Sequence, residues 1–95
     1  MSCYFIAQIR IHDQEEYGKY LAGVDDVFAK YKGEYLVVDD NPAVLEGEWP
    51  FTRIVVIRFP NEEELQRWYH SPEYQEILQH RLRAAQCSAI VAKGR

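Results

Sequence analysis

The fold of this chain is decided around one stretch in its second half, Trp68-Tyr69-His70-Ser71-Pro72-Glu73-Tyr74-Gln75. Ser71 fits the N-cap position of a helix, and Pro72 fits the first helical position, where no amide donor is needed. The stretch therefore predicts a junction between two short helices. Arg81 follows at a helical spacing that puts it with Tyr74 on the inward side of the second helix.

The segments on either side of this junction alternate between strand and helix patterns. Strands are predicted over residues 3–11, 34–39, 52–59 and 88–93, from alternating apolar residues and from β-branched runs. A long helix is predicted from Asp13, which forms a capping box with Glu16, to Gly33 at a left-handed C-terminal position. Asn61 caps the helix that leads to the junction, and the last helix runs from the junction to about residue 85.

One segment has a less regular pattern. Asp40-Asn41-Pro42 interrupts the second strand, and residues 43–49 are expected to resume it after a bulge or turn.

This order of elements predicts an α+β fold in a single domain over residues 1–95. Right-handed crossovers on one sheet give the ferredoxin-like βαββαβ arrangement, a four-stranded antiparallel sheet in the order 4-1-3-2 with its helices on one face. The other face would carry Tyr4, Ile6, Ile54 and Val56. Because so much apolar surface is rarely left in water, we expect a homodimer in which two sheets pair face to face.

Charge and hydropathy exclude several partner classes. A net charge of −4 argues against nucleic acid, because the surface would repel phosphate. No apolar run approaches the ~20 residues needed to span a bilayer, and the N-terminal stretch lacks the basic start of a signal peptide. Cys3 and Cys87 suit a reducing compartment. We therefore expect a cytoplasmic protein without a membrane or nucleic-acid partner.

Arg81 is the sharpest candidate for a functional residue. An inward-facing arginine is costly unless it is paired or faces a wet cleft. It could clamp a small carboxylate ligand, because the guanidinium fork matches a carboxylate. Alternatively, it could form a structural salt bridge, with Glu73, Glu46 or Glu48 as partners. Both interpretations are left open by the sequence.

The aromatic residues near Arg81 also have a functional and a structural interpretation. Trp68, Tyr69 and Tyr74 could wall a pocket for an aromatic ligand, or Trp68 and Tyr74 could pack the helix pair on the sheet. Ser71 fits a helix cap better than a nucleophile, because no base stands beside it in sequence. Tyr4 could line a cavity or meet a partner subunit. These candidates for ligand binding include no residue with an assigned catalytic role.

No cofactor or metal is predicted. The histidines His12, His70 and His80 do not have the spacing of metal ligands. No glycine-rich phosphate loop or Cys-x-x-Cys pair occurs. Acid–base chemistry would need a positioned titrating group, for which His70, Tyr4 and Tyr69 are candidates by residue type alone.

The junction, with Arg81, is preceded by Phe59-Pro60, Leu45-Glu46-Gly47 and Gly33-x-Tyr35-Leu36. Together these motifs resemble the domain-of-unknown-function 1330 family (DUF1330) over nearly the whole chain. The resemblance implies a dimeric α+β barrel and no established activity, in a superfamily that includes cofactor-independent monooxygenases, haem-degrading enzymes and dehydratases. The chain departs from the family pattern at Lys32 and at Asp39-Asp40, where glycines are usual. Two functions follow as alternatives: a small-molecule site, with or without cofactor-free catalysis, or a non-catalytic dimeric module for structure or interaction.

Overall fold

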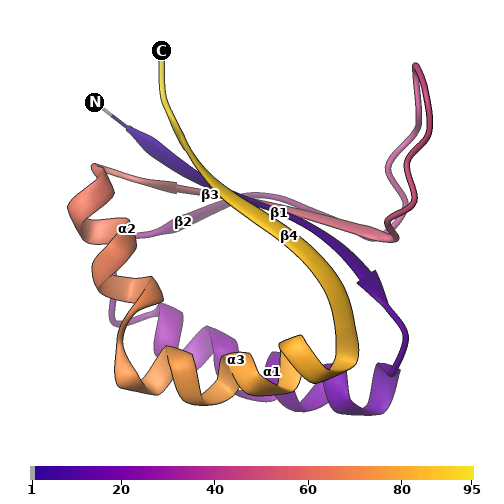
Figure 1. Cartoon of the computed structure of the whole chain (residues 1–95). Coiled ribbons are helices and arrows are strands. Elements are labelled where there is room, and N and C mark those ends of the chain that lie inside the picture. The colour runs from indigo at the N-terminus through magenta and orange to yellow at the C-terminus, as the bar shows by residue number, and fades with distance from the viewer. Residues whose placement is uncertain (1) are drawn as a thin grey trace.

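A computed structural model describes residues 2–95 of the chain, and its elements follow the predicted order (Figure 1). They are β1 (Cys3–Ile11), α1 (Gln14–Phe28), β2 (Glu34–Asp39), β3 (Arg53–Phe59), α2 (Glu62–Tyr69), α3 (Pro72–Ala84) and β4 (Ala85–Lys93). The strands form one antiparallel sheet in the order β2-β3-β1-β4, which confirms the predicted topology. Within residues 2–95, no helix is long and apolar enough to cross a bilayer.

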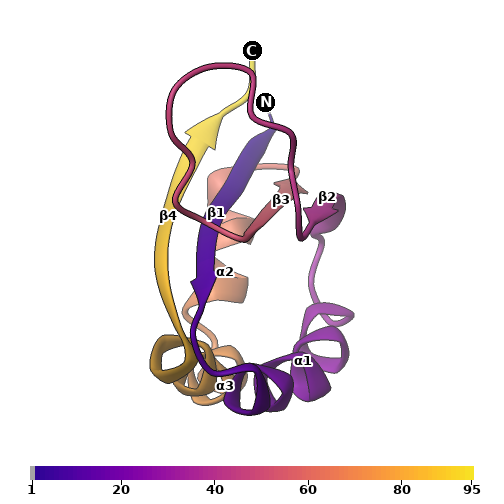
Figure 2. The same ribbon diagram turned by 90° about the vertical axis from the view of Figure 1, so that its right-hand side faces the viewer.

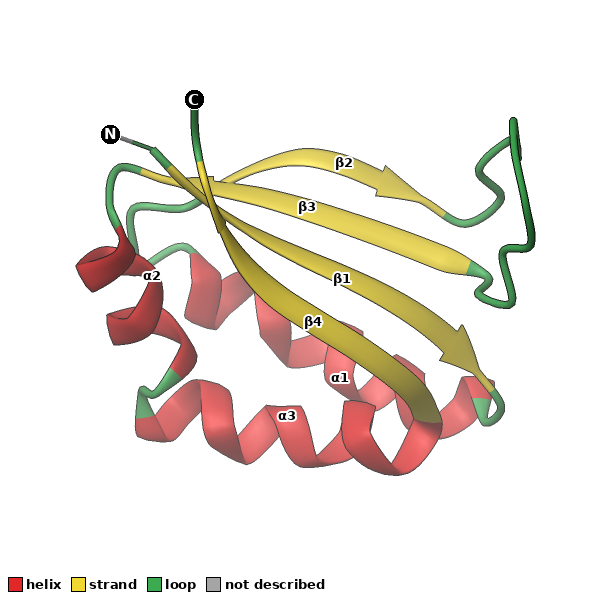
Figure 3. Cartoon of the chain, turned by 45° about the horizontal axis from the view of Figure 1, so that its top comes forward, coloured by secondary structure: helices red, strands yellow, loops and turns green. Residues whose placement is uncertain are grey.

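The three helices cover one face of the sheet and leave the other face open (Figures 1 and 3). Side chains alternate between the two faces along each strand. In β1, Phe5, Ala7 and Ile9 are buried against the helices, and their partners across β3 are Ile57, Val55 and Arg53. The first helix-facing residue of β3 is therefore an arginine.

The helix junction has the predicted cap. Ser71 Oγ accepts a hydrogen bond from the Tyr74 amide at 3.2 Å and donates one to the Trp68 carbonyl at 2.9 Å. This exchange holds α2 and α3 at a fixed angle and directs Trp68 and Tyr74 into the core. Their ring centroids lie 4.3 Å apart, and both side chains are fully buried.

The predicted end of the first helix was wrong. The helix α1 ends at Phe28, and Gly33 does not have the positive φ expected of a left-handed cap, which within residues 2–95 occurs only at Gly47. A different constraint favours glycine at position 33. A Cβ there would lie 2.5 Å from Phe28 Cζ and 2.8 Å from Phe59 Cζ, so a side chain would collide with two core rings.

The expected strand over residues 43–49 was also wrong, because residues 40–52 form a long loop between β2 and β3. This β2–β3 loop rises from the open face, away from the helices (Figures 1 and 2). Asp39 starts the departure from the sheet, because its carboxylate accepts a hydrogen bond from the Asn41 amide at 2.8 Å, and Pro42 follows. The last strand begins at Ala85, three residues before the predicted start.

Candidate functional site

A hollow on the helix side of the sheet lies between α1 and the strands β2 and β3. Its volume is about 470 Å³. We call it the α1–β2–β3 cleft; its lining is Tyr17, Tyr20, Leu21, Val24, Asp25, Tyr35, Val38, Arg53 and Val55. The cleft exists because α1 packs chiefly against α3, while every residue of β2 remains exposed. The edge of the sheet at β2 is therefore only partly covered by the helix layer.

Two tyrosines of α1 form the inner wall of the cleft. Tyr17 and Tyr20 are three residues apart, so they project from the same side of the helix, and both are buried. The Tyr20 hydroxyl lies 2.8 Å from the Tyr74 hydroxyl of α3 in a buried hydrogen bond. This bond joins the cleft to the helix that carries Arg81.

Arg53 provides the positive charge of the cleft. Strand alternation points it toward the helices, where its guanidinium carbon lies 5.8 Å from the centre of the Tyr17 ring. Its Nη1 donates a hydrogen bond of 2.7 Å to Asp40 Oδ1. Its Nε is buried without a hydrogen-bond partner. The guanidinium is therefore only partly satisfied by the protein.

Arg81 faces inward as predicted, and it is 3% exposed. Its guanidinium carbon lies 5.5 Å from the centre of the Tyr20 ring, and its Nε and Nη1 have no hydrogen-bond partner. The salt-bridge interpretation was wrong, because no acidic side chain among residues 2–95 forms an ion pair with Arg81, and Glu73 pairs with Lys30 instead. Arg81 is a buried cation that lies behind the cleft, separated from it by Tyr20.

The electrostatics of this region are set by buried phenols and by charged side chains of both signs. Burial raises the pKa of Tyr17, Tyr20 and Tyr74, and burial with the nearby Asp25 raises the pKa of Tyr35 to about 12. These phenols therefore stay neutral at physiological pH and can donate hydrogen bonds. Both arginines stay charged. The site thus combines neutral donors, the charges of Arg53 and Arg81, of which Arg53 is paired with Asp40, and the carboxylate of Asp25 in the wall of the cleft.

The six residues predicted from sequence do not form one site. Tyr74 and Arg81 come together, with Tyr20 between them and the cleft. Trp68 lies in the core, and Ser71 serves as the helix cap described above. Tyr4 lies on the open face, between Arg58 and Ala92 in the sheet. Tyr69 lines a separate hollow of about 210 Å³ between α2 and β4.

Sequence reasoning missed Tyr17, Tyr20, Tyr35, Arg53 and Asp40. A signal for Arg53 was present in the sequence, because in the strand predicted over residues 52–59 it lies on the same face as Val55 and Ile57. The tyrosines of α1 matched the pattern of an ordinary core stripe. No local pattern distinguished them from residues that are covered on all sides.

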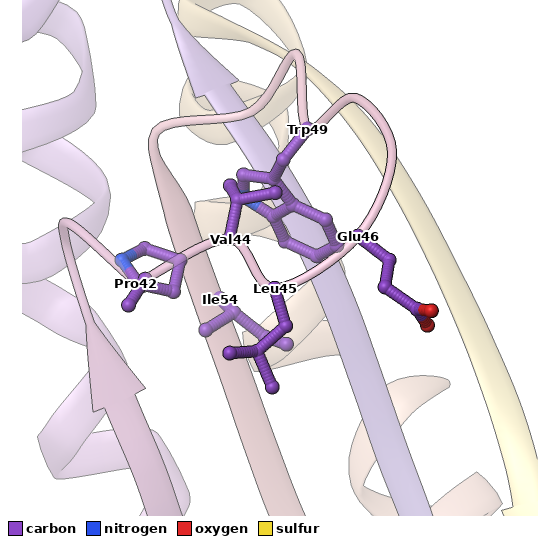
Figure 4. Close-up of a pocket in the computed structure, with 7 residues that line it drawn as sticks. Pro42, Val44, Leu45, Glu46, Trp49 and Ile54 are labelled. Carbon is purple, nitrogen blue, oxygen red and sulfur yellow. The ribbon is translucent and has the colours of Figure 1, made fainter.

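A further hollow of about 300 Å³ lies on the opposite face, inside the β2–β3 loop. Val44, Leu45 and Trp49 gather over Ile54 of β3, while the carboxylate of Glu46 points away from them (Figure 4). Leu45 is 96% exposed. Among residues 2–95, no group of three His, Cys, Asp or Glu side chains is arranged to hold a metal ion.

Glu16 at the start of α1 gives a pH-dependent prediction. Its carboxylate accepts hydrogen bonds from His80, Lys19 and Arg83, and these contacts, the His80 bond first, lower its pKa from 4.5 to about 2. A lowered pKa contributes stability above pH 4.5 that is lost as the pH falls toward 2. We expect the melting temperature of the wild type to exceed that of Glu16→Gln above pH 5, and the two to converge as the pH falls from 4 toward 2. Parallel curves down to pH 2 would contradict this assignment.

Solved structures with this fold include proteins of unknown function and an enzyme. One is a protein of unknown function from Rhodopseudomonas palustris, 18% identical, with a TM-score of 0.81; the match covers 99% of this chain and 82% of that one. A dimeric ferredoxin-like protein of unknown function from Jannaschia is 10% identical with a TM-score of 0.82, over 99% of this chain and all of that one (100%). SnoaB, a cofactor-independent oxygenase from Streptomyces nogalater, is 12% identical with a TM-score of 0.70, over 99% and 93% of the two chains. At these identities the likeness concerns the fold.

No curated protein matches the sequence significantly. A family model described as a domain of unknown function (DUF1330) matches residues 2–95. The match includes the helix junction, the α1 tyrosines and both arginines. The chain therefore belongs to the DUF1330 family.

Proposed function

We propose that this protein binds a small carboxylate with an aromatic or apolar body in the α1–β2–β3 cleft. The observation that carries the proposal is the guanidinium of Arg53 in the wall of the cleft, among phenols and apolar side chains, with Asp40 at the exposed rim as its ion-pair partner and Asp25 elsewhere in the lining. A guanidinium binds a carboxylate through parallel hydrogen bonds. Val24, Val38 and Val55 would contact the apolar body. Arg81 would add a favourable potential from behind Tyr20 without touching the ligand.

Cofactor-free catalysis in the same cleft is a second candidate. It is favoured by the hydrogen bond between Tyr20 and Tyr74 next to Arg81, since such donors would stabilise negative charge that develops on a bound oxygen. The fold supports this idea only by analogy with the oxygenase SnoaB. A non-catalytic dimeric module remains the alternative if the cleft binds no anion.

Calorimetric titration with benzoate tests the binding proposal. Benzyl alcohol serves as the control ligand, because it has the same ring and no charge. We expect saturable benzoate binding in the millimolar range or tighter, much weaker binding of benzyl alcohol, and a loss of at least about tenfold in Arg53→Gln. Arg58→Gln, on the open face, should bind as the wild type does. Equal binding of both ligands, or unchanged binding in Arg53→Gln, would contradict the proposal.

We also infer that the chain forms a homodimer through the open face of its sheet (Figure 3). Ile6, Val56 and Ile90 lie side by side across β1, β3 and β4 on that face. Apolar surface of this kind on a small domain is typical of an interface. The dimeric neighbour of the same fold supports this assembly.

Ile90→Lys is expected to weaken the dimer by at least about tenfold, because it would bury an unpaired charge in the interface. The matched control is Leu82→Lys, since Leu82 of α3 is 53% exposed and Ile90 is 58% exposed. Sedimentation equilibrium over a micromolar range of concentrations measures the dimer dissociation constant of each variant. A monomeric wild type, or equal effects of the two substitutions, would be inconsistent with this interface.

We also propose that the protein is cytoplasmic. Cys3 and Cys87 are both free thiols, which suits a reducing compartment. In β1 and β4 they pair with Lys93 and Ile9, at opposite ends of the sheet.

A further inference from the structure

We propose that Asp40 is an internal carboxylate that occupies the ligand position on Arg53 and is displaced when a carboxylate ligand binds. This inference rests on the proposed function of the α1–β2–β3 cleft. It concerns the selectivity of the cleft for charged ligands and its affinity for them. Asp40 is the first residue of the β2–β3 loop, and its partner Arg53 is the first residue of β3.

The two partners of this ion pair are held very differently. The side chain of Arg53 is 14% exposed, and that of Asp40 is 73% exposed. Arg53 is fixed by its strand and by the ring of Tyr17. Asp40 lies at the rim, and the turn next to it is held by Asp39 and Asn41 rather than by its own side chain. The cation is therefore a fixed part of the site, whereas the carboxylate can turn into solvent.

Two hollows meet at Arg53. A second hollow of about 340 Å³ shares Tyr17, Leu21 and Arg53 with the α1–β2–β3 cleft. Asp40 lines this second hollow and not the cleft itself. The carboxylate of Asp40 therefore reaches the guanidinium from one side, while the apolar cleft opens on the other.

A ligand carboxylate and Asp40 compete for the same groups. Because Nε is buried, a two-pronged grip on the guanidinium must use Nη1, which Asp40 already holds. The single positive charge of Arg53 is also neutralised by Asp40 in the free protein. A ligand gains the full attraction only when Asp40 leaves. An ion pair with so exposed a partner contributes little to stability. Its displacement by a ligand therefore costs little free energy.

This arrangement would make the site selective. A neutral ligand cannot replace the charge of Asp40 on Arg53, so the ion pair stays closed and the ligand gains only its apolar contacts in the cleft. A carboxylate ligand replaces one charge by another and gains its apolar contacts in addition. The same competition lowers the affinity for every anion and would favour rapid release.

Benzoate titration of Asp40→Asn tests the inference. Asp39→Asn is the matched control, because it makes the same change of charge one residue away and its residue pairs with Ile54 in the sheet. We expect Asp40→Asn to bind benzoate about fivefold more tightly than the wild type, because the exposed ion pair no longer has to be broken and its repulsion of the ligand is removed. Asp39→Asn should stay within about twofold, as expected for a screened surface charge. Benzyl alcohol should gain affinity in Asp40→Asn by less than benzoate does.

The outcomes separate this inference from the proposed function. If benzoate binds the wild type through Arg53 but Asp40→Asn binds equally or more weakly, the role of Asp40 is wrong and the binding site stands. If Asp39→Asn tightens binding as much as Asp40→Asn, the effect is one of net charge and the inference is again overturned. If neither the wild type nor Asp40→Asn binds benzoate, the proposed function itself fails.

Discussion

Replacing Trp68 with alanine is expected to lower the free energy of unfolding by about 3–5 kcal/mol, as for other large aromatic residues removed from a core. Trp68 is 1% exposed, and its ring centroid lies 5.2 Å from that of Phe5 and 5.5 Å from that of Phe59. It thus joins α2, α3 and two central strands. For a domain of this size the loss corresponds to a fall of at least about 12 °C in melting temperature.

Thermal melts at one fixed protein concentration measure this effect, because dimerisation would make the melting temperature depend on concentration. Trp68→Phe should lose much less than Trp68→Ala, since it keeps an aromatic ring and the indole Nε1 has no hydrogen-bond partner to lose. Trp49→Ala, in the β2–β3 loop, is the control for removal of an indole outside the core. If Trp68→Ala cost no more than Trp49→Ala, the helix junction would not be the centre of the fold.

Arg81→Met is expected to stabilise the free protein and to weaken ligand binding. Arg81 is buried, two of its nitrogens lack hydrogen-bond partners, and no acidic side chain within residues 2–95 forms an ion pair with it. Replacing such a charge with an apolar side chain of similar volume removes its desolvation penalty. We expect a gain of about 1–2 kcal/mol in the free energy of unfolding. Benzoate affinity should fall about fivefold, because the potential behind Tyr20 is lost.

The control for Arg81→Met is Arg67→Met in α2, because Arg67 is an exposed arginine in a loose ion pair with Glu64 at 3.4 Å. It should change stability by less than about 1 kcal/mol and leave benzoate binding unchanged. A variant Arg81→Met that is clearly less stable than the wild type would mean that its contacts with Tyr20 and Tyr74 outweigh the cost of burial. That result would make Arg81 a structural residue.

Much of the fold follows from local signals. The caps at Asp13, Asn61 and Ser71 each mark a helix start because a side-chain oxygen satisfies an exposed amide there. The β-branched run in β3 and the alternation in β1 placed the central strands and their faces. The order of elements then left few possible topologies. The inward position of Arg81 could be predicted for the same reason, since helical spacing fixes a side chain's direction.

The candidate site could not be predicted in the same way, because it depends on what the helices fail to cover. Tyr17 and Tyr20 have the spacing of core residues, and only the incomplete cover over β2 turns their surroundings into a cleft. The pairing of Asp40 with Arg53 joins two ends of a loop whose path is not fixed by propensity. The expectation of a strand over residues 43–49 was wrong for the same reason, because the apolar residues there belong to this loop and do not pair with a neighbouring strand.

The proposed function requires that an anion binds on the helix side of the sheet, at Arg53. Its most direct test is a benzoate titration of ¹⁵N-labelled protein followed through the backbone amide shifts. We expect saturable shifts that are largest at Tyr17, Tyr20, Tyr35 and Arg53, in the α1–β2–β3 cleft. Shifts that are largest around Val44 and Trp49 in the loop hollow, or around Tyr69 between α2 and β4, would contradict it, as would the absence of any saturable shift.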